Sequence, residues 1–184
     1  MNTYVLIYEG FTQFEVVLAN YFLKTKGEII TVGINNNIVL SAEGFRTVPH
    51  TVLEEVKVED VDLFIIPGGD PDKLISNKEF YNLLNKLNDE KKKIGAICSG
   101  TVHLAKSGVL NGKKFTTSVS IDEYKYFNKI DFKNDNIVVD GNILTAKANG
   151  YVDFAIELGT IMNIYKDEAD LKETIDFFKY FKDS

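Results

Sequence analysis

Apolar runs typical of buried strands alternate with amphipathic segments along the first hundred residues of the chain. Runs rich in β-branched and aromatic residues predict strands, and apolar residues at three- and four-residue steps predict helices. The predicted strands span residues 4–8, 28–32, 61–66 and 94–97, with short strands between 38 and 48. The predicted helices carry apolar stripes at Phe14, Val17, Leu18, Tyr21 and Phe22, and at Phe80, Leu83, Leu84 and Leu87.

The last third of the chain predicts a hairpin and two further helices. Asp140-Gly141-Asn142 separates two short apolar runs and is a good hairpin turn. Apolar stripes from Tyr151 to Met162 and from Leu171 to Phe178 predict the helices. Strands that alternate with helices indicate an α/β fold, with a mostly parallel sheet covered on both faces. The length of 184 residues, without a linker or repeat, predicts a single domain over residues 1–184.

Charge and composition narrow the class of partner. Lys and Arg number 21 against 27 Asp and Glu, and the longest basic run is Lys91 to Lys93, so we expect no nucleic-acid partner. No apolar stretch is long enough to span a membrane, and no signal peptide is recognisable. One cysteine cannot form an intramolecular disulfide. We therefore expect a soluble, cytoplasmic protein without a membrane partner.

Cys98 lies where a predicted buried strand ends and a helix begins. Ala96 and Gly100, two residues to either side, complete the pattern of a nucleophile elbow, where larger side chains would collide at the sharp turn. A helix that begins at Ser99 would point unpaired amides at the sulfur and favour the reactive thiolate. The alternative is a buried, inert core cysteine, because free cysteine is among the most buried residue types.

Four other segments accompany the elbow in a fixed order. They are Glu15, residues 62–69 (DLFIIPGG), residues 108–112 (GVLNG) and residues 140–145 (DGNILT). From about Tyr4 to about Asn163 the chain thereby resembles the ThiJ/PfpI superfamily, which includes a parkinsonism-associated deglycase, bacterial isocyanide hydratases and PfpI-type intracellular peptidases. The resemblance implies a flavodoxin-like three-layer sandwich with a strained cysteine at the elbow. It also implies a homodimer, for which Tyr21 and Phe22 offer aromatic surface.

Glu15 has two competing roles. The resemblance implies that its carboxyl reaches the Cys98 sulfur and transfers a proton there. For that, Glu15 must be buried and neutral or proton-shuttling, because a fixed negative charge would raise the thiol pKa. Thr12 to Glu15 also matches a capping box, in which the glutamate would satisfy a backbone amide at the helix start. Spacing alone favours the cap; the resemblance favours the catalytic partner, which we adopt.

Gly68 and Gly69 end the strongest predicted strand. In open α/β sheets, ligands bind beyond the carboxyl ends of the strands, where this loop and the elbow would meet. The resemblance implies an oxyanion hole formed by the amides of Gly69 and Ser99, with Gly68 lining the same pocket. The alternative is a tight turn that needs the positive φ of glycine, and both roles are compatible.

The chain departs from the family at one position. Many members carry a histidine after a Thr-Thr pair, and here Thr116-Thr117 leads into Ser118, which becomes a pocket residue. The two histidines are His50, expected in a solvated loop, and His103, expected to point away from the sulfur in a structural or surface role. A Cys–His pair is therefore not expected, which disfavours glutaminase chemistry and predicts poor peptidase activity.

Three functions remain open. The first is an enzyme in which Cys98 attacks a small electrophilic substrate and Glu15 moves the proton, by isocyanide hydration, conversion of a 2-oxoaldehyde to a hydroxy acid, or amide hydrolysis. The second is a non-catalytic redox sensor or stress-response protein that signals through Cys98 oxidation. The third is a flavodoxin-like binding domain, although no phosphate-binding glycine motif supports a nucleotide or flavin. No cofactor and no metal are expected.

Overall fold

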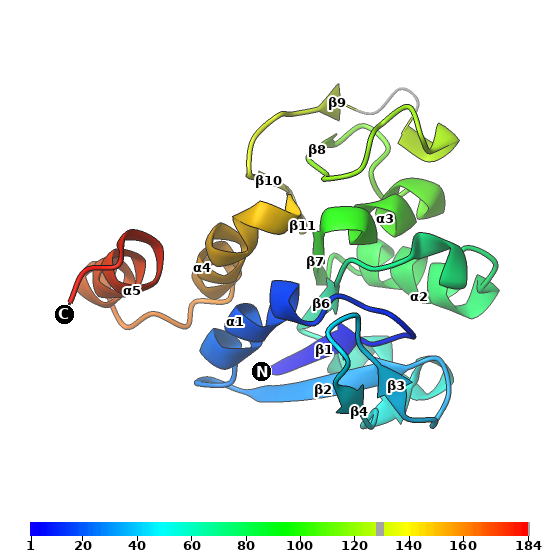
Figure 1. The fold of residues 1–184 in the computed structure, drawn as a ribbon, viewed down its shortest axis with the longest axis horizontal. Coiled ribbons are helices and arrows are strands. Elements are labelled where there is room, and N and C mark those ends of the chain that lie inside the picture. Colours follow the sequence, from blue (N-terminus) through cyan, green and yellow to red (C-terminus); the bar gives the residue numbers. More distant parts are fainter. Residues whose placement is uncertain (128–130, 184) are drawn as a thin grey trace.

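The computed structural model describes residues 1–127 and 131–183, and its centre is a seven-stranded sheet of order β10-β11-β7-β6-β1-β2-β5 (Figure 1). Its strands are β1 (Asn2–Leu6), β2 (Glu28–Gly33), β5 (Thr51–Val52), β6 (Leu63–Ile66), β7 (Lys93–Ile97), β10 (Ile137–Asp140) and β11 (Ile143–Ala146). Every neighbouring pair is parallel except β10 and β11. Two small sheets accompany it, formed by β3 (Val39–Leu40) with β4 (Arg46–Thr47) and by β8 (Lys114–Phe115) with β9 (Asp131–Phe132).

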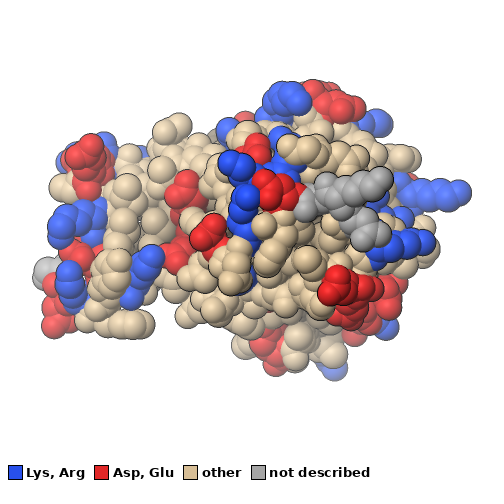
Figure 2. Space-filling model, turned by 90° about the horizontal axis from the view of Figure 1, so that it is seen from above, with Lys and Arg blue, Asp and Glu red and all other residues tan. Residues whose placement is uncertain are grey.

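Helices cover both faces of the sheet, which confirms the predicted α/β architecture (Figure 1). They are α1 (Phe14–Leu23), α2 (Lys78–Asp89), α3 (Thr101–Ser107), α4 (Tyr151–Ile161) and α5 (Glu168–Tyr180). The pair α1 and α4 packs together on one side, and α2 and α3 lie on the other. The C-terminal helix α5 packs outside this pair, against α4, and contains no fully buried residue. Figure 2 shows Lys and Arg interspersed with Asp and Glu on the face seen from above.

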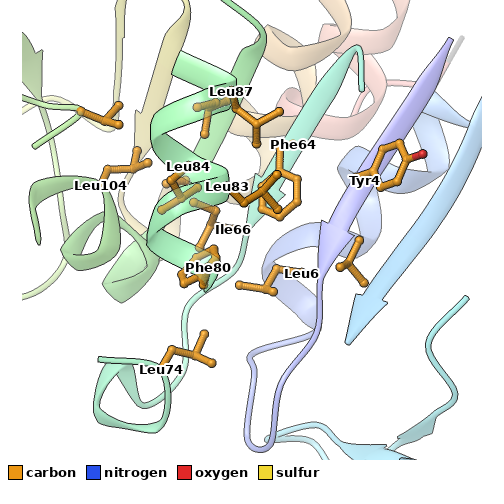
Figure 3. Close-up of a cluster of buried hydrophobic side chains, with 14 of the residues drawn as sticks. Tyr4, Leu6, Phe64, Ile66, Leu74, Phe80, Leu83, Leu84, Leu87 and Leu104 are labelled. Atoms are coloured by element: carbon orange, nitrogen blue, oxygen red, sulfur yellow. The ribbon is translucent and has the colours of Figure 1, made fainter. Parts of the chain in front are cut away.

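The burial of strand β6 on both faces explains why its four residues are all apolar. Successive strand residues point to opposite faces, so a strand covered on both sides must be apolar throughout. Phe64 and Ile66 join the cluster under α2 and α3, and Leu63 and Ile65 join the cluster under α1 and α4. Figure 3 shows part of the first cluster, in which Phe80, Leu83 and Leu87 of α2 lie against the strand that carries Phe64 and Ile66.

The apolar stripe predicted for the first helix is not its buried face. Glu15, Val16, Ala19, Phe22 and Leu23 are buried, whereas most of the predicted stripe lies on the surface. The exposed members, with their exposed fractions, are Phe14 (49%), Val17 (49%) and Tyr21 (65%). The helix is apolar around most of its circumference, and the buried face contains a glutamate and an alanine. The spacing pattern therefore selected the more hydrophobic, exposed face.

Several element boundaries depend on turns that the sequence marks only weakly. The apolar run at residues 4–8 is buried, but β1 ends at Leu6 because the Phe11 amide donates to the Tyr8 carbonyl and turns the chain. The predicted hairpin is confirmed, with Asp140 paired to Ile143 and Gly141 at φ 66°. Among the described residues, no helix has the length and apolarity needed to cross a membrane.

Truncating the Phe64 side chain is expected to destabilise the protein strongly. Phe64 is fully buried at the centre of the sheet, so Phe64→Ala should lower the free energy of unfolding by about 3–5 kcal/mol. Phe45→Ala is the matched control, because Phe45 is 61% exposed and its loss leaves no cavity. Urea unfolding followed by circular dichroism measures both. Equal effects of the two substitutions would contradict this account of the core.

Candidate active site

Cys98 occupies the elbow predicted from the sequence. It follows β7 directly and has φ 56°, a left-handed conformation that a non-glycine residue adopts only under constraint. Gly100 permits the turn, because a Cβ at that position would lie 2.5 Å from the Ile66 carbonyl oxygen and 2.7 Å from that of Pro67. The turn that follows, Cys98–Gly100, is a 3-10 helix that leads into the seven-residue helix α3.

The sheet order brings three loops together at its carboxyl edge. Strands β1, β6 and β7 are neighbours, so the segments that follow them meet. The first segment leads to Glu15 in the first turn of α1, the second contains Gly68 and Gly69, and the third begins at Cys98. Three segments far apart in the sequence therefore share one site.

Glu15 faces this site and does not cap its helix. Its side chain is 2% exposed, and its Oε2 accepts a hydrogen bond of 2.7 Å from the Gly68 amide. The capping-box interpretation is wrong because Glu43 provides the cap, accepting bonds from the Gln13 amide at 3.1 Å and the Phe14 amide at 2.9 Å. Because Glu43, from the β3–β4 turn, caps the helix, the Glu15 carboxyl can contact Cys98 instead.

Gly68 separates the carboxylate from the nucleophile. A Cβ at Gly68 would lie 2.6 Å from Glu15 Oε2 and 2.9 Å from Cys98 Cβ. Any other residue there would push apart the two groups, because neither the elbow backbone nor the buried carboxylate has room to move. The absence of a side chain at Gly68 is what allows Glu15 and Cys98 to lie in contact.

Burial governs the ionisation of both groups. Desolvation raises the pKa of the Glu15 carboxyl, although the Gly68 amide and the Cys98 side chain act in the opposite direction. Desolvation and the Glu15 charge raise the pKa of the Cys98 thiol to about 11, despite hydrogen bonds from the Ser99 amide and Ser118 that lower it. The expected stabilisation of the thiolate at the helix start is therefore outweighed. At neutral pH the pair holds the thiol proton, and Glu15 is the adjacent group that can accept it.

The two amides predicted to form the oxyanion hole, those of Ser99 and Gly69, have different partners in the structure. The Ser99 amide lies at the sulfur, where it lowers the pKa of the Cys98 thiol. The Gly69 amide donates instead to the Ser99 hydroxyl at 2.9 Å, and the same hydroxyl donates to the Gly69 carbonyl at 2.7 Å. Gly69 has φ 139°, in the region reserved for glycine. The Gly69 amide can serve an oxyanion only if its bond to Ser99 opens.

Ser118 stands close to the nucleophile, and neither histidine does. The exposed Ser118 hydroxyl accepts a bond of 2.7 Å from the Ala148 amide, and its effect on Cys98 is to lower the thiol pKa. His103 is fully buried, its Nδ1 lies 2.9 Å from the Tyr81 hydroxyl, and burial lowers its pKa to about 4. His50 is exposed and contacts Thr31. Serine thus offers a hydrogen bond at the sulfur but no base.

Two threonines that the sequence did not identify as site residues form hydrogen bonds to the elbow backbone. The hydroxyls of Thr101 and Thr117 donate to the Cys98 carbonyl oxygen at 2.8 Å and 3.2 Å, and the two hydroxyls lie 2.7 Å apart. Both residues are buried. The Thr116-Thr117 pair before Ser118 is recognisable in the sequence, but its contact with the elbow backbone is not. Their bonds hold the strained Cys98 backbone in place.

The part of the chain that the structure describes contains no cluster of three or more His, Cys, Asp or Glu side chains able to hold a metal ion.

Replacing Glu15 with glutamine is expected to stabilise the protein at neutral pH. Because the pKa of this carboxyl is raised in the folded state, the native protein favours the protonated form, and stability is lost as pH rises through that pKa. Glu15→Gln removes this cost while keeping an oxygen for the Gly68 amide. Its thermal midpoint should exceed that of the wild type at pH 7, with the gap closing below about pH 4. Exposed Glu54→Gln is the control; a lower midpoint for Glu15→Gln at pH 7 would contradict the prediction.

Comparisons with known proteins show the family to which the chain belongs. The DJ-1/PfpI family model matches residues 1–160. A deglycase of Pyrococcus abyssi is 25% identical over 152 residues, covering 82% of this chain and 92% of its own, and an uncharacterised protein of Methanocaldococcus jannaschii is 34% identical over 132 residues, covering 69% and 59%. A ThiJ/PfpI family protein of Bacillus anthracis superposes with a TM-score of 0.88 at 22% identity, covering 99% of this chain and 92% of that one. The chain belongs to the DJ-1/PfpI family.

Proposed function

We propose that this protein is a cysteine-dependent enzyme that acts on a small electrophilic carbonyl compound, with Cys98 as nucleophile and Glu15 as the proton-transfer group. The observation that carries the proposal is the buried Glu15 carboxyl beside the strained Cys98, separated from it only by the bare Cα of Gly68. Strain and buried carboxyl groups are costly, and they cluster at sites that use them. Curated relatives named deglycases in Pyrococcus species support an enzyme of this kind.

The conversion of a 2-oxoaldehyde to a 2-hydroxy acid fits the available groups best. The Cys98 sulfur bonds to the aldehyde carbon while Glu15 takes the thiol proton and passes it to the carbonyl oxygen. Glu15 then moves a proton from the first carbon to the second, and the hydroxyl proton on the first carbon's oxygen passes to the oxygen of the second carbon, which leaves a thioester of the 2-hydroxy acid. Water cleaves the thioester, releasing the acid and the free thiol. One proton-transfer group serves every step.

The pKa values of Cys98 and Glu15 set the order of these reaction steps. The thiol pKa of about 11 means that Cys98 rests as a thiol and becomes a nucleophile only as its proton leaves. A buried carboxylate, whose pKa is raised, is a stronger base than one in water and accepts that proton more readily. Once protonated, Glu15 no longer repels negative charge on the sulfur. Attack and proton transfer are therefore coupled.

Peptide hydrolysis fits less well, although one relative in Bacillus subtilis is named an uncharacterised protease. An amine leaving group needs a proton at the moment it departs, and a cysteine peptidase supplies it from a histidine. Here Ser118 occupies that part of the site, and His103 is buried against Tyr81. We expect weak or absent cleavage of casein and peptides.

The redox-sensor alternative is less well supported by the site. The thiolate, and not the thiol, reacts with peroxide, and the raised pKa of Cys98 keeps the thiolate fraction small at neutral pH. The chain also has no second cysteine to form an internal disulfide with an oxidised Cys98. Oxidation of Cys98 is therefore expected to be slow compared with its reaction with a bound carbonyl compound.

Turnover of a small-molecule panel tests the proposal. Glyoxal, methylglyoxal, an isocyanide and simple amides are offered to the wild type, Cys98→Ala, Cys98→Ser, Glu15→Gln and the exposed control Ser120→Ala. We expect 2-oxoaldehyde turnover that disappears in both Cys98 variants, falls by about 10²–10⁴-fold in Glu15→Gln, and persists in the control. Full turnover in Cys98→Ala would overturn the mechanism, and turnover of the isocyanide alone would reassign the substrate.

We further infer that the protein is a homodimer that pairs through the exposed face of α1. A groove of about 670 Å³ runs between α1, α4 and α5, lined largely by aromatic and aliphatic side chains. The exposed portions of Phe14, Tyr21, Phe45, Phe177 and Phe181, with Val17 and Tyr151, amount to about four whole aromatic side chains, or roughly 800 Å². That is the area each partner contributes to a standard interface.

The dimer should dissociate when a charge enters this groove. Tyr21→Glu places a carboxylate at a position that is 65% exposed, so the folded monomer tolerates it while an apolar interface does not. Sedimentation should give a dimer for the wild type and a species near 20.7 kDa for the variant. Glu79→Lys on the surface of α2 is the control. A monomeric wild type at micromolar concentration would refute the inference.

A further inference from the structure

Ser99, the residue after the nucleophile, makes an unusual pair of hydrogen bonds. Its hydroxyl accepts from the Gly69 amide at 2.9 Å and donates to the Gly69 carbonyl at 2.7 Å. Its side chain is 6% exposed, so these bonds are shielded from water. One hydroxyl group therefore satisfies both backbone groups of a residue in a different loop.

The glycine loop needs such support. Two consecutive glycines give the chain more conformational freedom than any other pair, and Gly69 is held at φ 139°. Gly69 also has no room for a Cβ, which would lie 2.6 Å from the Tyr8 hydroxyl. Without bonds to fix it, this loop would sample other conformations, and the position of the Gly68 amide would change with it.

The bonds fix one peptide unit from both ends. The carbonyl of Gly68 and the amide of Gly69 belong to the same planar group. The Thr12 amide donates to that carbonyl at 2.9 Å, and Ser99 accepts from that amide at 2.9 Å. A plane held at two opposite edges cannot rotate, so the Gly68 amide that precedes it keeps its direction toward Glu15, to which it donates at 2.7 Å.

We propose that Ser99 is a positioning residue: its hydroxyl pins the Gly68–Gly69 peptide and thereby holds the Gly68 amide on the Glu15 carboxylate. The hydroxyl does not touch the reacting atoms and acts through the glycine loop. The proposal rests on the proposed function only in giving Glu15 a proton-transfer role. It makes the residue after the nucleophile responsible for the basicity of the proton acceptor, in addition to its amide contact with the sulfur.

Loss of the Ser99 hydroxyl is expected to raise the pKa of Glu15. The Gly68 amide lowers the pKa of Glu15, opposing the effect of burial, so weakening that bond raises the pKa further. The other ionisable groups that face this site are Cys98 on the elbow, Glu43 in the β3–β4 turn, whose charge raises the pKa of Glu15, and the buried Tyr8. None of them is altered by a change at Ser99.

Direct titration of Glu15 provides the test. The side-chain carboxyl carbon of Glu15 is followed by ¹³C NMR against pH in the wild type, Ser99→Ala, Ser99→Thr and Ser107→Ala. Ser107 is the matched control because it lies on the same segment and its hydroxyl bonds the Leu104 carbonyl at 2.9 Å, away from the site. We expect the Glu15 midpoint to rise by about one pH unit in Ser99→Ala, the order of one charge-assisted hydrogen bond, and to return in Ser99→Thr. An unchanged midpoint in folded Ser99→Ala, or an equal rise in Ser107→Ala, would overturn the proposal.

Amide hydrogen exchange on the wild type keeps the proposal testable should Ser99→Ala not fold. The amides of Gly68 and Gly69 should exchange far more slowly than that of Gly112, an exposed turn glycine. Exchange at Gly69 as fast as at Gly112 would show that the Ser99 bond is not maintained in solution and would refute the proposal. Neither measurement uses a substrate. A failure to find turnover would therefore contradict the proposed function, whereas the role of Ser99 would still be tested by the titration and the hydrogen exchange.

Discussion

The hydrogen bond from the Gly68 amide to the buried Glu15 carboxylate is the interaction on which the site depends. A carboxylate that is 2% exposed is costly to ionise, and this bond is the backbone contact that offsets part of the cost. It requires the loop after β6 to pass directly between α1 and the elbow, with no side chain at Gly68. The order of β1, β6 and β7 in the sheet makes that passage possible, because their carboxyl ends lie side by side.

In the proposed mechanism, Glu15 activates Cys98 without a histidine. An imidazole beside a thiol yields an ion pair at neutral pH, whereas a carboxylate beside a thiol resists the second negative charge. Burial raises both pKa values, and the Glu15 charge raises the pKa of the Cys98 thiol further, so the thiol is protonated at neutral pH. In the proposed mechanism this thiol reacts slowly with oxidants and readily with a carbonyl carbon held beside it. The proposal therefore assigns to the site substrates whose reaction needs one proton-transfer group.

The sequence predicted the sheet and the elbow because both depend on local patterns. Continuous apolar runs identify strands buried on two faces, and small residues around Cys98 identify a turn that excludes side chains. The role of Glu15 was ambiguous because its spacing from Thr12 equally fits a cap. The structure resolves the ambiguity, because Glu43, twenty-eight positions along the chain, accepts the hydrogen bonds of the amides at the helix start. No spacing rule within one helix can reveal a cap supplied by another loop.

Other features depended on long-range contacts in the same way. The ionisation of Cys98 could be argued from the helix start alone, but burial and the Glu15 charge outweigh that contribution, and both arise only in the folded chain. The buried face of α1 was misjudged because the partner helix α4 lies against the less hydrophobic side, where Glu15 must point inward. A glutamate on the buried face thus weakened the hydrophobic pattern by which that face could be recognised in the sequence.

That conflict also explains why the opposite face of α1 is so apolar. A helix whose buried side carries a glutamate and an alanine contributes less apolar surface to the core than one lined with leucine. The exposed side carries Phe14, Val17 and Tyr21, which join side chains of α4 and α5 around the groove. A second copy covering this groove would bury α1 on both sides, so that the helix which presents Glu15 is clamped from outside as well as from within. The proposed dimer and the proposed catalysis would then depend on the same ten-residue helix, which holds a buried acid beside Cys98.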